Sequence, residues 1–375
     1  MVDQQNRTGR ARWRWRLVAG LGALLLLVAA GAVTGLVLDA GSGSRVLPGG
    51  GPPSPSPSPS PTPSPTPDPG ADITGPLNLL LVGIDPRESQ PAWRPNADTV
   101  MIMHVNARLT RAYLFSLPRD LLVDVPAFEP AGSGATRTKL THAMSIGSQV
   151  PGQGLPDREQ GFALLSATVS RYTGIDQFDA GAVLNFGGFT DLVDAVGGIQ
   201  DFYVDQRVVS LHREPDGTHR DLQPGGGGYV GPQKVYEVGE QYLAGWEALD
   251  YARQRYITGG DYARQRHQRQ LVKALVREVF QAELVTDPAG QEQVLQAVGD
   301  ALVFVGHDQR VVDFAFALQE VGANRIELVE LPGSSVFGGG SYLGEQLNPV
   351  ADQFLAAVNG NRVARFLTNH PGLTG

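Results

Sequence analysis

The sequence predicts one α/β domain, with a central mixed sheet flanked by helices on both faces, behind a single N-terminal transmembrane helix. Three features lead to this prediction. An uncharged apolar run lies near the N-terminus, a proline-rich segment follows it, and from residue 75 strand-like apolar runs alternate with helical patterns. The 375 residues, 42% of them hydrophobic, are enough for one large domain or two ordinary ones.

The transmembrane anchor is predicted over residues 17–38, which carry no charge and as a helix would span the roughly 30 Å hydrocarbon core of a bilayer. Residues 1–16 contain five arginines against one aspartate, so the positive-inside rule assigns this basic tail to the cytoplasm. We therefore expect a single-pass protein of the cell membrane whose C-terminal part is extracytoplasmic. The alternative is a cleaved signal peptide, whose apolar region is usually shorter, about 7–15 residues.

Residues 39–74 are predicted to form an extracytoplasmic linker. Within them, residues 49–70 are rich in glycine, proline and serine, with proline at alternate positions over most of their length. Alternating proline keeps a chain extended, close to polyproline II, and such a segment cannot pack a core. We expect a semi-rigid stalk that holds a folded domain, residues 75–370, away from the membrane.

Nearly continuous apolar runs in the folded part predict strands that are buried on both faces. The predicted strands are residues 76–84, 99–105, 112–117, 199–204 and 326–331. Helical patterns fill most of the intervals between them. The predicted helices are residues 159–173, 188–196, 244–255, 261–281, 290–304, 309–321 and 349–359. Residues 205–238 are polar and glycine-rich, which predicts a long exposed flap.

Charge and composition exclude several classes of function. The net charge is −8 although the N-terminal tail is basic, so the remainder is strongly acidic and unsuited to general nucleic-acid binding. The absence of cysteine excludes disulfides and cysteine-ligated metals. The sequence has neither a G-x-S-x-G nucleophile elbow nor an H-E-x-x-H zinc helix. His212 and His219 flank what reads as a surface turn.

Arginines, one lysine, acids and one glutamine form the candidate site. Several follow predicted strands, where a mixed α/β domain places ligand-binding groups. They are Asp85, Arg87, Asp98, Arg119, Lys139, Arg253, Arg255, Asp261, Arg264 and Gln268. A guanidinium group can bind two phosphate oxygens at once, and carboxylates among such groups suit a divalent metal. We infer that the ligand is a pyrophosphate.

The start of the long predicted helix concentrates several of these groups. Asp261 is a good N-cap candidate, and Arg264 and Gln268 lie four residues apart on one helix face. Helix N-termini attract anions, and Arg253 and Arg255 lie just upstream. The alternative interpretation of this segment is a solvated helix face with salt bridges.

Taken in order, the motifs around these residues resemble those of the LytR–CpsA–Psr family of cell-wall glycopolymer ligases. The resemblance covers roughly residues 76–365. The segments that carry it are residues 78–87, 97–101, 116–120, 139–140, 187–198, 248–256 and 260–268. Their order and spacing together are specific, although no single segment is decisive.

The resemblance implies roles for individual residues. Arg119, Lys139, Arg253, Arg255 and Gln268 match residues that contact the pyrophosphate of a polyprenyl lipid. Asp85 and Asp98 match residues that hold magnesium, for which manganese could substitute, while Asp261 and Arg264 complete the polar cluster. Arg87 is counted with the pyrophosphate-binding group, and Asp85, Asp98, Arg119 and Arg255 form the expected catalytic group. An apolar tunnel for the lipid is also implied.

Two departures from the family pattern lie close to the site. Asn96 stands where the family commonly has arginine, and Arg94 is the expected substitute. His267 stands where the family often has arginine before the helix glutamine, with Arg266 beside it.

The implied function is that of an extracytoplasmic phosphotransferase. It would move a glycopolymer from a polyprenyl-pyrophosphate carrier to a peptidoglycan sugar hydroxyl and form a phosphodiester, with Asp85 or Asp98 as the base. One alternative is a pyrophosphatase that uses water as the acceptor. Another is a non-catalytic lipid-binding or regulatory envelope protein. A nucleic-acid partner is not expected.

Overall fold

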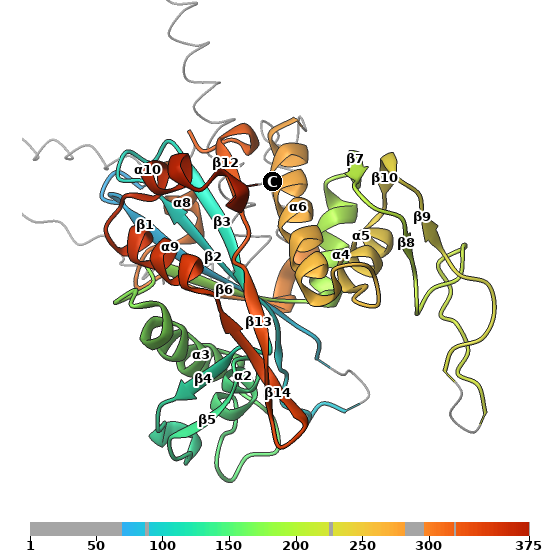
Figure 1. Ribbon diagram of the computed structural model, residues 1–375, viewed down its shortest axis with the longest axis horizontal. Helices are drawn as coiled ribbons and strands as arrows, with labels where there is room; N and C mark the ends of the chain where they lie inside the picture. Colours follow the sequence, from blue (N-terminus) through green and yellow to red (C-terminus); the bar gives the residue numbers. More distant parts are fainter. Residues whose placement is uncertain (1–69, 87–89, 225–227, 282–295, 319, 375) are drawn as a thin grey trace, which may run out of the picture.

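The computed structural model of the chain describes residues 70–86, 90–224, 228–281, 296–318 and 320–374 (Figure 1). Its centre is a six-stranded sheet in the order β11-β6-β1-β2-β3-β12. The strands are β1 (Leu77–Ile84), β2 (Ala97–Val105), β3 (Ala112–Leu117), β6 (Ala180–Asn185), β11 (Leu302–Val305) and β12 (Ile326–Val329). β1 pairs in parallel with β6, and β3 with β12, whereas the other neighbours are antiparallel, so the sheet is mixed as predicted.

The central strands are buried on both faces, which is why their sequences read as continuous apolar runs. Alternate residues of β1 enter two separate cores: Leu79 and Leu81 on one side, Leu80 and Val82 on the other. The first core is completed by α4 (Phe186–Ala195), α5 (Gly245–Arg253), α6 (Gly260–Gln281) and α8 (Val311–Ala317). The second is completed by α2 (Thr141–Gly147), α3 (Arg158–Thr173), α9 (Pro349–Asn359) and α10 (Val363–Asn369). Helices therefore cover both faces (Figure 1).

Short sheets and 3-10 turns complete the fold. The two-stranded pairs are β4 (Leu122–Val125) with β5 (Thr136–Lys139), β7 (Ile199–Val204) with β10 (Gly239–Leu243), β8 (Val208–Val209) with β9 (Val235–Tyr236), and β13 (Gly333–Gly338) with β14 (Ser341–Leu347). The 3-10 turns are η1 (Glu129–Ala131), η3 (Gly299–Ala301), η4 (Ala323–Arg325) and η5 (Pro371–Leu373). The predicted flap contains β8 and β9 and projects from the body of the domain (Figure 1).

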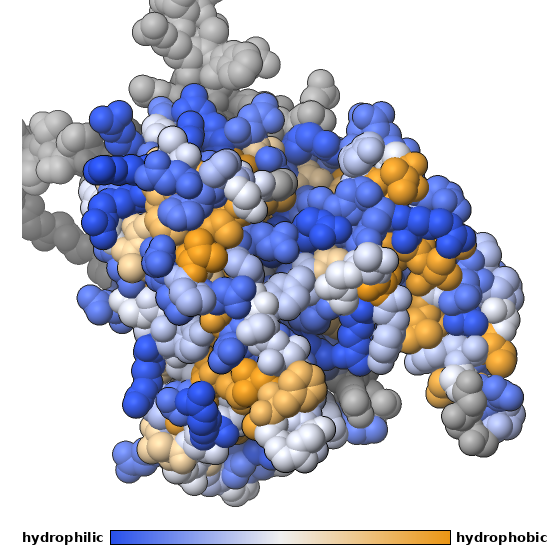
Figure 2. Space-filling view, in the orientation of Figure 1, coloured by the Kyte–Doolittle hydropathy of each residue, from blue (hydrophilic) through white to orange (hydrophobic). Residues whose placement is uncertain are grey.

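The β13–β14 hairpin crosses the face of the molecule shown in Figure 2, where apolar side chains gather over it. Phe337 and Leu343 on this hairpin are exposed.

Two predicted elements differ from the structure. Residues 302–304, predicted as the end of a helix, belong to β11, because antiparallel pairing with β6 at the sheet edge outweighs local helical preference. The strand predicted over residues 199–204 forms as β7 but pairs with β10 outside the central sheet. β6 occupies a place in the sheet where no strand was predicted.

The predicted cytoplasmic tail, the anchor over residues 17–38 and the linker up to residue 69 lie outside the described residues. Among the residues that are described, no helix combines the length and the apolar character needed to cross a membrane.

Candidate functional site

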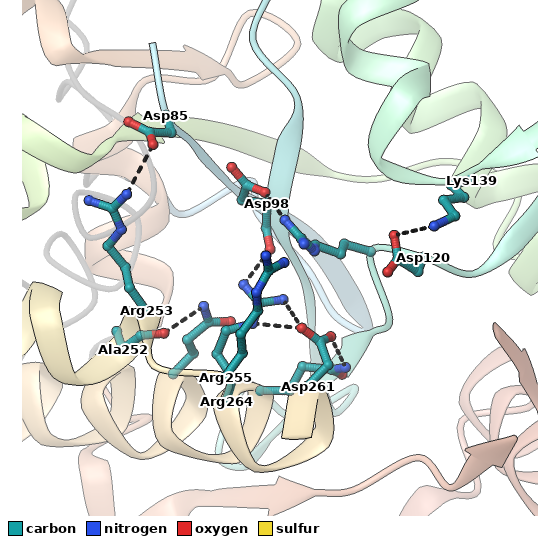
Figure 3. A network of polar contacts seen from close by, with 12 residues as sticks. Asp85, Asp98, Asp120, Lys139, Ala252, Arg253, Arg255, Asp261 and Arg264 are labelled. Atoms are coloured by element: carbon teal, nitrogen blue, oxygen red, sulfur yellow. Dashed lines mark hydrogen bonds and ion pairs between the residues drawn. The ribbon is translucent and has the colours of Figure 1, made fainter. Parts of the chain in front are cut away.

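A polar cleft of about 430 Å³ lies where β1 and β2 meet, beside α5 and the start of α6. Its charged lining consists of two acids and four arginines: Asp85, Asp98, Arg119, Arg253, Arg255 and Arg264 (Figure 3). Arg119 precedes Arg253 by more than 130 residues in the sequence. The structure therefore brings the predicted arginines and carboxylates into one cleft.

A β-bulge aims Asp98 into this cleft. Gly83 pairs with Thr99 and Ile84 pairs with Ala97, so Asp98 is the extra residue between them. Its carboxylate accepts a hydrogen bond from Arg119 Nη1, and its main-chain oxygen accepts one from Arg264 Nη1 at 3.0 Å. The extra residue thus gives both arginines a partner on the same strand.

Asp85 follows the last residue of β1 and is paired with Arg253. Arg253 Nη2 donates to Asp85 Oδ2 at 3.2 Å, and its guanidinium carbon lies 4.8 Å from the ring centre of Phe186. α5 ends at Arg253, and extended backbone at Gln254 turns the chain before Arg255. Arg255 lies 5.3 Å from the ring centre of the exposed Tyr256.

Asp261 is not the N-cap that the sequence predicts, because α6 begins at Gly260 and Asp261 lies within its first turn. Its carboxylate instead accepts hydrogen bonds from side chains, Arg264 Nε at 2.8 Å and Gln265 Nε2 at 3.1 Å. Burial alone would raise the pKa of Asp261, but Arg264, Gln265 and the charge of Arg119 outweigh it and lower the pKa. Asp261 therefore orients Arg264 toward the bulge.

Arg119 lies near the centre of the network. Burial alone would lower the pKa of its guanidinium, but the carboxylate of Asp98, with help from Asp261 and Asp120, raises it. Its Nε is buried and has no hydrogen-bond partner within the described part of the chain. Arg119 thus carries one buried donor that the described residues leave unsatisfied.

Gln268 lies one helical turn beyond Arg264 on α6 and also lines the cleft. Its Nε2 donates to the main-chain oxygen of Ala252 at 3.2 Å, which ties α6 to α5. Its Oε1 is buried without a partner among the described residues.

Of the predicted pyrophosphate-binding residues that the structure describes, Lys139 and Asp261 are not among those that line this cleft. Lys139 is paired with Asp120 Oδ1 at 3.3 Å and lies 4.6 Å from the ring centre of Tyr342, away from Asp85 in Figure 3. Arg87 lies outside the described residues. Arg94, the expected substitute at the Asn96 position, donates to Gln149 rather than facing the cleft, whereas Asn96 itself lines it.

His212 and Trp93 also line the cleft, although the sequence predicted His212 beside a surface turn and indicated no role for Trp93. The base of the flap folds back on α5, where Leu211 N donates to Gln254 Oε1 at 3.0 Å, and this brings His212 to the cleft. Burial, and after it the charge of Arg253, lower the pKa of His212. No motif spacing connects the flap to α5, so only the tertiary fold reveals this placement.

An apolar pocket of about 90 Å³ adjoins the cleft between the sheet and helices α4, α5 and α6. Leu81, Met101, Leu184, Phe189, Leu249 and Leu271 contribute to its wall. The pocket and the cleft share Phe186, Arg253 and Gln268. A ligand with a charged head and an apolar tail would therefore find both surfaces side by side.

The two carboxylates of the cleft fit magnesium in chemical type. Within the described residues, no group of three or more His, Cys, Asp or Glu side chains could hold a metal by itself. Magnesium, however, is commonly held by one or two carboxylates together with substrate phosphates and water. Asp85 and Asp98 line the same cleft and supply the oxygen ligands that such a site needs.

The chain matches the LytR_cpsA_psr family over residues 57–357. It is 30% identical over 226 residues to the polyisoprenyl-teichoic acid–peptidoglycan teichoic acid transferase TagU of Enterococcus faecalis, covering 60% of each chain. It is 27% identical over 257 residues to the cell wall biosynthesis protein LcpA of Corynebacterium glutamicum, covering 66% of this chain and 45% of that protein. The chain thus spans about three-fifths or less of these relatives.

Solved structures share the fold. The protein gbs0355 from Streptococcus agalactiae matches with a TM-score of 0.58 and 23% identity, over 78% of this chain and 88% of that one. TagV of Bacillus subtilis matches with a TM-score of 0.54 and 18% identity, over 77% and 98%. The family match covers most of the chain, including the whole described sheet and the cleft, and so this chain belongs to the LytR_cpsA_psr family.

Proposed function

We propose that the protein is an extracytoplasmic, membrane-anchored phosphotransferase. It moves a glycopolymer from a polyprenyl-pyrophosphate carrier to a sugar hydroxyl of peptidoglycan and forms a phosphodiester. The observation that carries this proposal is the junction of a cleft lined by arginines and aspartates with an apolar pocket. The negative charge of a pyrophosphate complements the arginines of the cleft, and the first isoprene units of a lipid match the apolar lining of the pocket.

The names of relatives support this proposal. TagU of Enterococcus faecalis is a teichoic acid transferase that acts on peptidoglycan, and LcpA of Corynebacterium glutamicum is a cell wall biosynthesis protein. A structure with the same fold, at a TM-score of 0.50 and 20% identity, is TagT bound to LI-WTA. The name of LcpA does not specify a glycopolymer, so the proposal includes both teichoic acid and arabinogalactan.

The chemical step follows from the charges of the cleft. The acceptor oxygen attacks the phosphorus that carries the glycan, and the bond from that phosphorus to the bridging oxygen breaks. Polyprenyl phosphate leaves, and the hydroxyl proton passes to the carboxylate of Asp85 or Asp98. Arg119, Arg253, Arg255 and Arg264 bind the pyrophosphate and offset the charge that develops on the leaving phosphate.

Asp85 and Asp98 would also hold magnesium, or manganese in its place, together with the substrate. The metal would neutralise phosphate charge when bound. The ion pairs of Asp85 with Arg253 and of Asp98 with Arg119 orient both carboxylates in the cleft.

The proposal is tested by transfer of label. The full-length protein in detergent is given a polyprenyl-pyrophosphate-linked glycan with labelled sugar, a peptidoglycan oligomer and magnesium. We expect labelled glycan phosphate on the oligomer, formed at least ten-fold more slowly by Arg253→Ala. If the wild-type protein puts no label on peptidoglycan under conditions where it binds the lipid, the proposed function is wrong.

A further inference from the structure

A second hollow of about 500 Å³ adjoins the cleft, and no step described so far uses it. It is called here the side groove and is defined by the residues that line it. These are Asp85, Pro86, Gln90, Pro91, Trp93, Pro95, Leu155, Pro156, Arg158, Asn185, Phe186 and Gly187. The side groove shares Asp85, Trp93 and Phe186 with the cleft, so a ligand in one reaches the edge of the other.

The side groove and the apolar pocket meet at Asn185 and Phe186, which line both, and beyond these residues each hollow has walls of its own. The apolar pocket belongs to the face covered by α4, α5 and α6. The side groove is bounded by Arg158 and by Pro156, at the start of α3, and α3 packs on the other face. Asp85, at the end of β1, lines the side groove but is not among the residues that line the apolar pocket.

This placement matters for displacement at phosphorus, because attacking and leaving oxygens lie roughly in line on opposite sides of the reacting atom. If the lipid enters the apolar pocket, its phosphate leaves on that side. The attacking hydroxyl must then approach away from the apolar pocket and close to a base, and Asp85, one of the two proposed bases, lines the side groove but not that pocket. The side groove is therefore placed for the acceptor rather than for the leaving lipid.

The lining of the side groove suits a sugar. Trp93 is 42% exposed and Leu155 is 63% exposed, and the prolines add further apolar surface. Arg158 and Asn185 add polar groups that can hydrogen-bond to hydroxyl or acyl oxygens. Small-molecule pockets commonly combine apolar surface with a few polar side chains that fix the orientation of the ligand. Here the apolar surface can contact the C–H face of a pyranose. Among the described residues, one arginine and one aspartate line the side groove, in contrast to the highly charged cleft.

The wall formed by α3 is held in place before any ligand binds. Asp157 caps α3 by accepting from Gln160 N at 2.9 Å. Gln160 Nε2 in turn donates to the main-chain oxygens of Gly147 at 2.7 Å and Gln149 at 2.6 Å. On the opposite wall, the side chain of Asn185 caps α4 by accepting from Gly188 N at 2.8 Å. A preformed wall lowers the ordering cost of binding.

We propose that the side groove binds the glycan strand of the peptidoglycan acceptor and presents one of its hydroxyls to the cleft beside Asp85. This inference rests on the proposed function, because it names the acceptor subsite of that reaction. Leu155 and Arg158 line the side groove without lining the cleft, so they can be changed without touching the pyrophosphate site.

The test compares variants of the full-length protein in detergent. The probe is a tetrasaccharide of alternating N-acetylglucosamine and N-acetylmuramic acid with stem peptides, and the donor is a labelled polyprenyl-pyrophosphate glycan. For Leu155→Ser/Arg158→Ala we expect the KM for the tetrasaccharide to rise at least ten-fold, with the KM for the donor within two-fold of wild type. Arg171→Ala is the matched control: it removes an exposed arginine from the other end of α3 and should leave both KM values unchanged.

The outcomes separate this inference from the proposed function. An unchanged acceptor KM in a variant that keeps the wild-type melting temperature would refute the side groove as acceptor site, while transfer itself still supports the proposed function. A raised donor KM with an unchanged acceptor KM would assign the side groove to the donor glycan and also overturn the inference. If the wild-type protein transfers nothing to the tetrasaccharide or to longer peptidoglycan, the proposed function fails first.

Discussion

The arginines that are proposed to bind pyrophosphate are held by carboxylates in the cleft, Arg253 by Asp85 and Arg119 by Asp98. Each pair orients a long side chain before the ligand arrives, which lowers the entropy that binding would otherwise cost. The same carboxylates are the proposed metal ligands. Metal binding would therefore draw Asp85 and Asp98 from the arginines toward the metal and leave the guanidiniums to the phosphates.

Replacing Arg119 tests the clamp directly. Arg119→Ala should lose charge-assisted hydrogen bonds of about 1.5–3 kcal/mol, which weakens polyprenyl-pyrophosphate binding roughly 10- to 150-fold. Arg137→Ala is the control, since Arg137 forms an exposed pair with Asp124. Titration calorimetry with the full-length protein in detergent measures the change. Wild-type affinity in folded Arg119→Ala would show that Arg119 does not bind the pyrophosphate.

The carboxylates make a second prediction at this scale. Activity should disappear with a chelator and return with magnesium or manganese, because the two aspartates need a cation to bind phosphate rather than repel it. Asp85→Asn/Asp98→Asn should lose at least 100-fold in transfer rate and gain nothing from added metal. Asp124→Asn serves as the control for loss of a carboxylate. Full activity of the double variant would refute the metal site.

The separate residues of this site could be predicted from the sequence, but their partners could not. Asp85, Asp98, Arg119, Arg253 and Arg255 stand in motifs, and the structure brings all five to one cleft. The bulge at Asp98 and the pairing of Lys139 with Asp120 depend on the register of distant strands, which a motif does not encode. His212 reaches the cleft only because the flap folds back on α5.

At the scale of elements, one cluster ties the start of the flap to α5 and α6. Asp205 accepts hydrogen bonds from Arg266 Nε at 2.8 Å and Gln270 Nε2 at 3.0 Å, and lies 3.2 Å from His267 Nε2. His267 is fully buried and stacks on Tyr251 of α5 at a ring distance of 4.3 Å. Burial alone would raise the pKa of Asp205, but His267, Arg266 and Gln270 outweigh it and lower the pKa well below 3.8.

This cluster predicts a pH-dependent contribution to stability. A depressed carboxyl pKa in the folded state stabilises the protein above the unfolded value and loses that effect as the pH falls through the folded value. Asp205→Asn should therefore lower the free energy of unfolding by about 1–2 kcal/mol at pH 7, after allowance for partial exposure. The difference from wild type should shrink as the pH falls below about 4.

Urea unfolding of wild type and Asp205→Asn at several pH values measures this difference. Asp124→Asn, which removes an exposed partner of Arg137, should change stability by less than about 0.5 kcal/mol at every pH. A difference between wild type and Asp205→Asn that stays constant from pH 7 to pH 3 would contradict the assigned role of Asp205.

Strands could be predicted from the sequence where burial on both faces produces a run of apolar residues. β1, β2 and β3 are nearly all buried, and their apolar runs were recognised. β6 was missed because small residues replace bulky ones there: a Cβ on Gly181 would lie 1.9 Å from the Phe162 ring of α3. The small residues of β6 allow close packing against α3, and the local sequence does not reveal this contact.

For the whole molecule, the proposed membrane topology predicts on which side of the membrane residues 4 and 56 lie, whatever the structure of the folded domain. A cysteine at Ser56 should react with a membrane-impermeant thiol reagent on intact cells, because the stalk is expected outside the membrane. A cysteine at Gln4 should react only after the cells are opened. The native chain has no cysteine, so the background is clean. The reverse labelling pattern would overturn both the localisation and a function in the cell wall.

The last prediction concerns the fraction of donor molecules that the site transfers to peptidoglycan and the fraction that it hydrolyses. Water can replace a sugar hydroxyl at the same phosphorus, so the cleft alone would also serve a pyrophosphatase. An acceptor held beside Asp85 gains an orientation advantage that free water lacks, and adding peptidoglycan oligomer should therefore raise the turnover of the labelled donor. The co-product should be polyprenyl phosphate, because the bond that breaks lies between the two phosphorus atoms. Free glycan phosphate as the sole labelled product, at a rate that the oligomer does not change, would establish the protein as a pyrophosphatase instead.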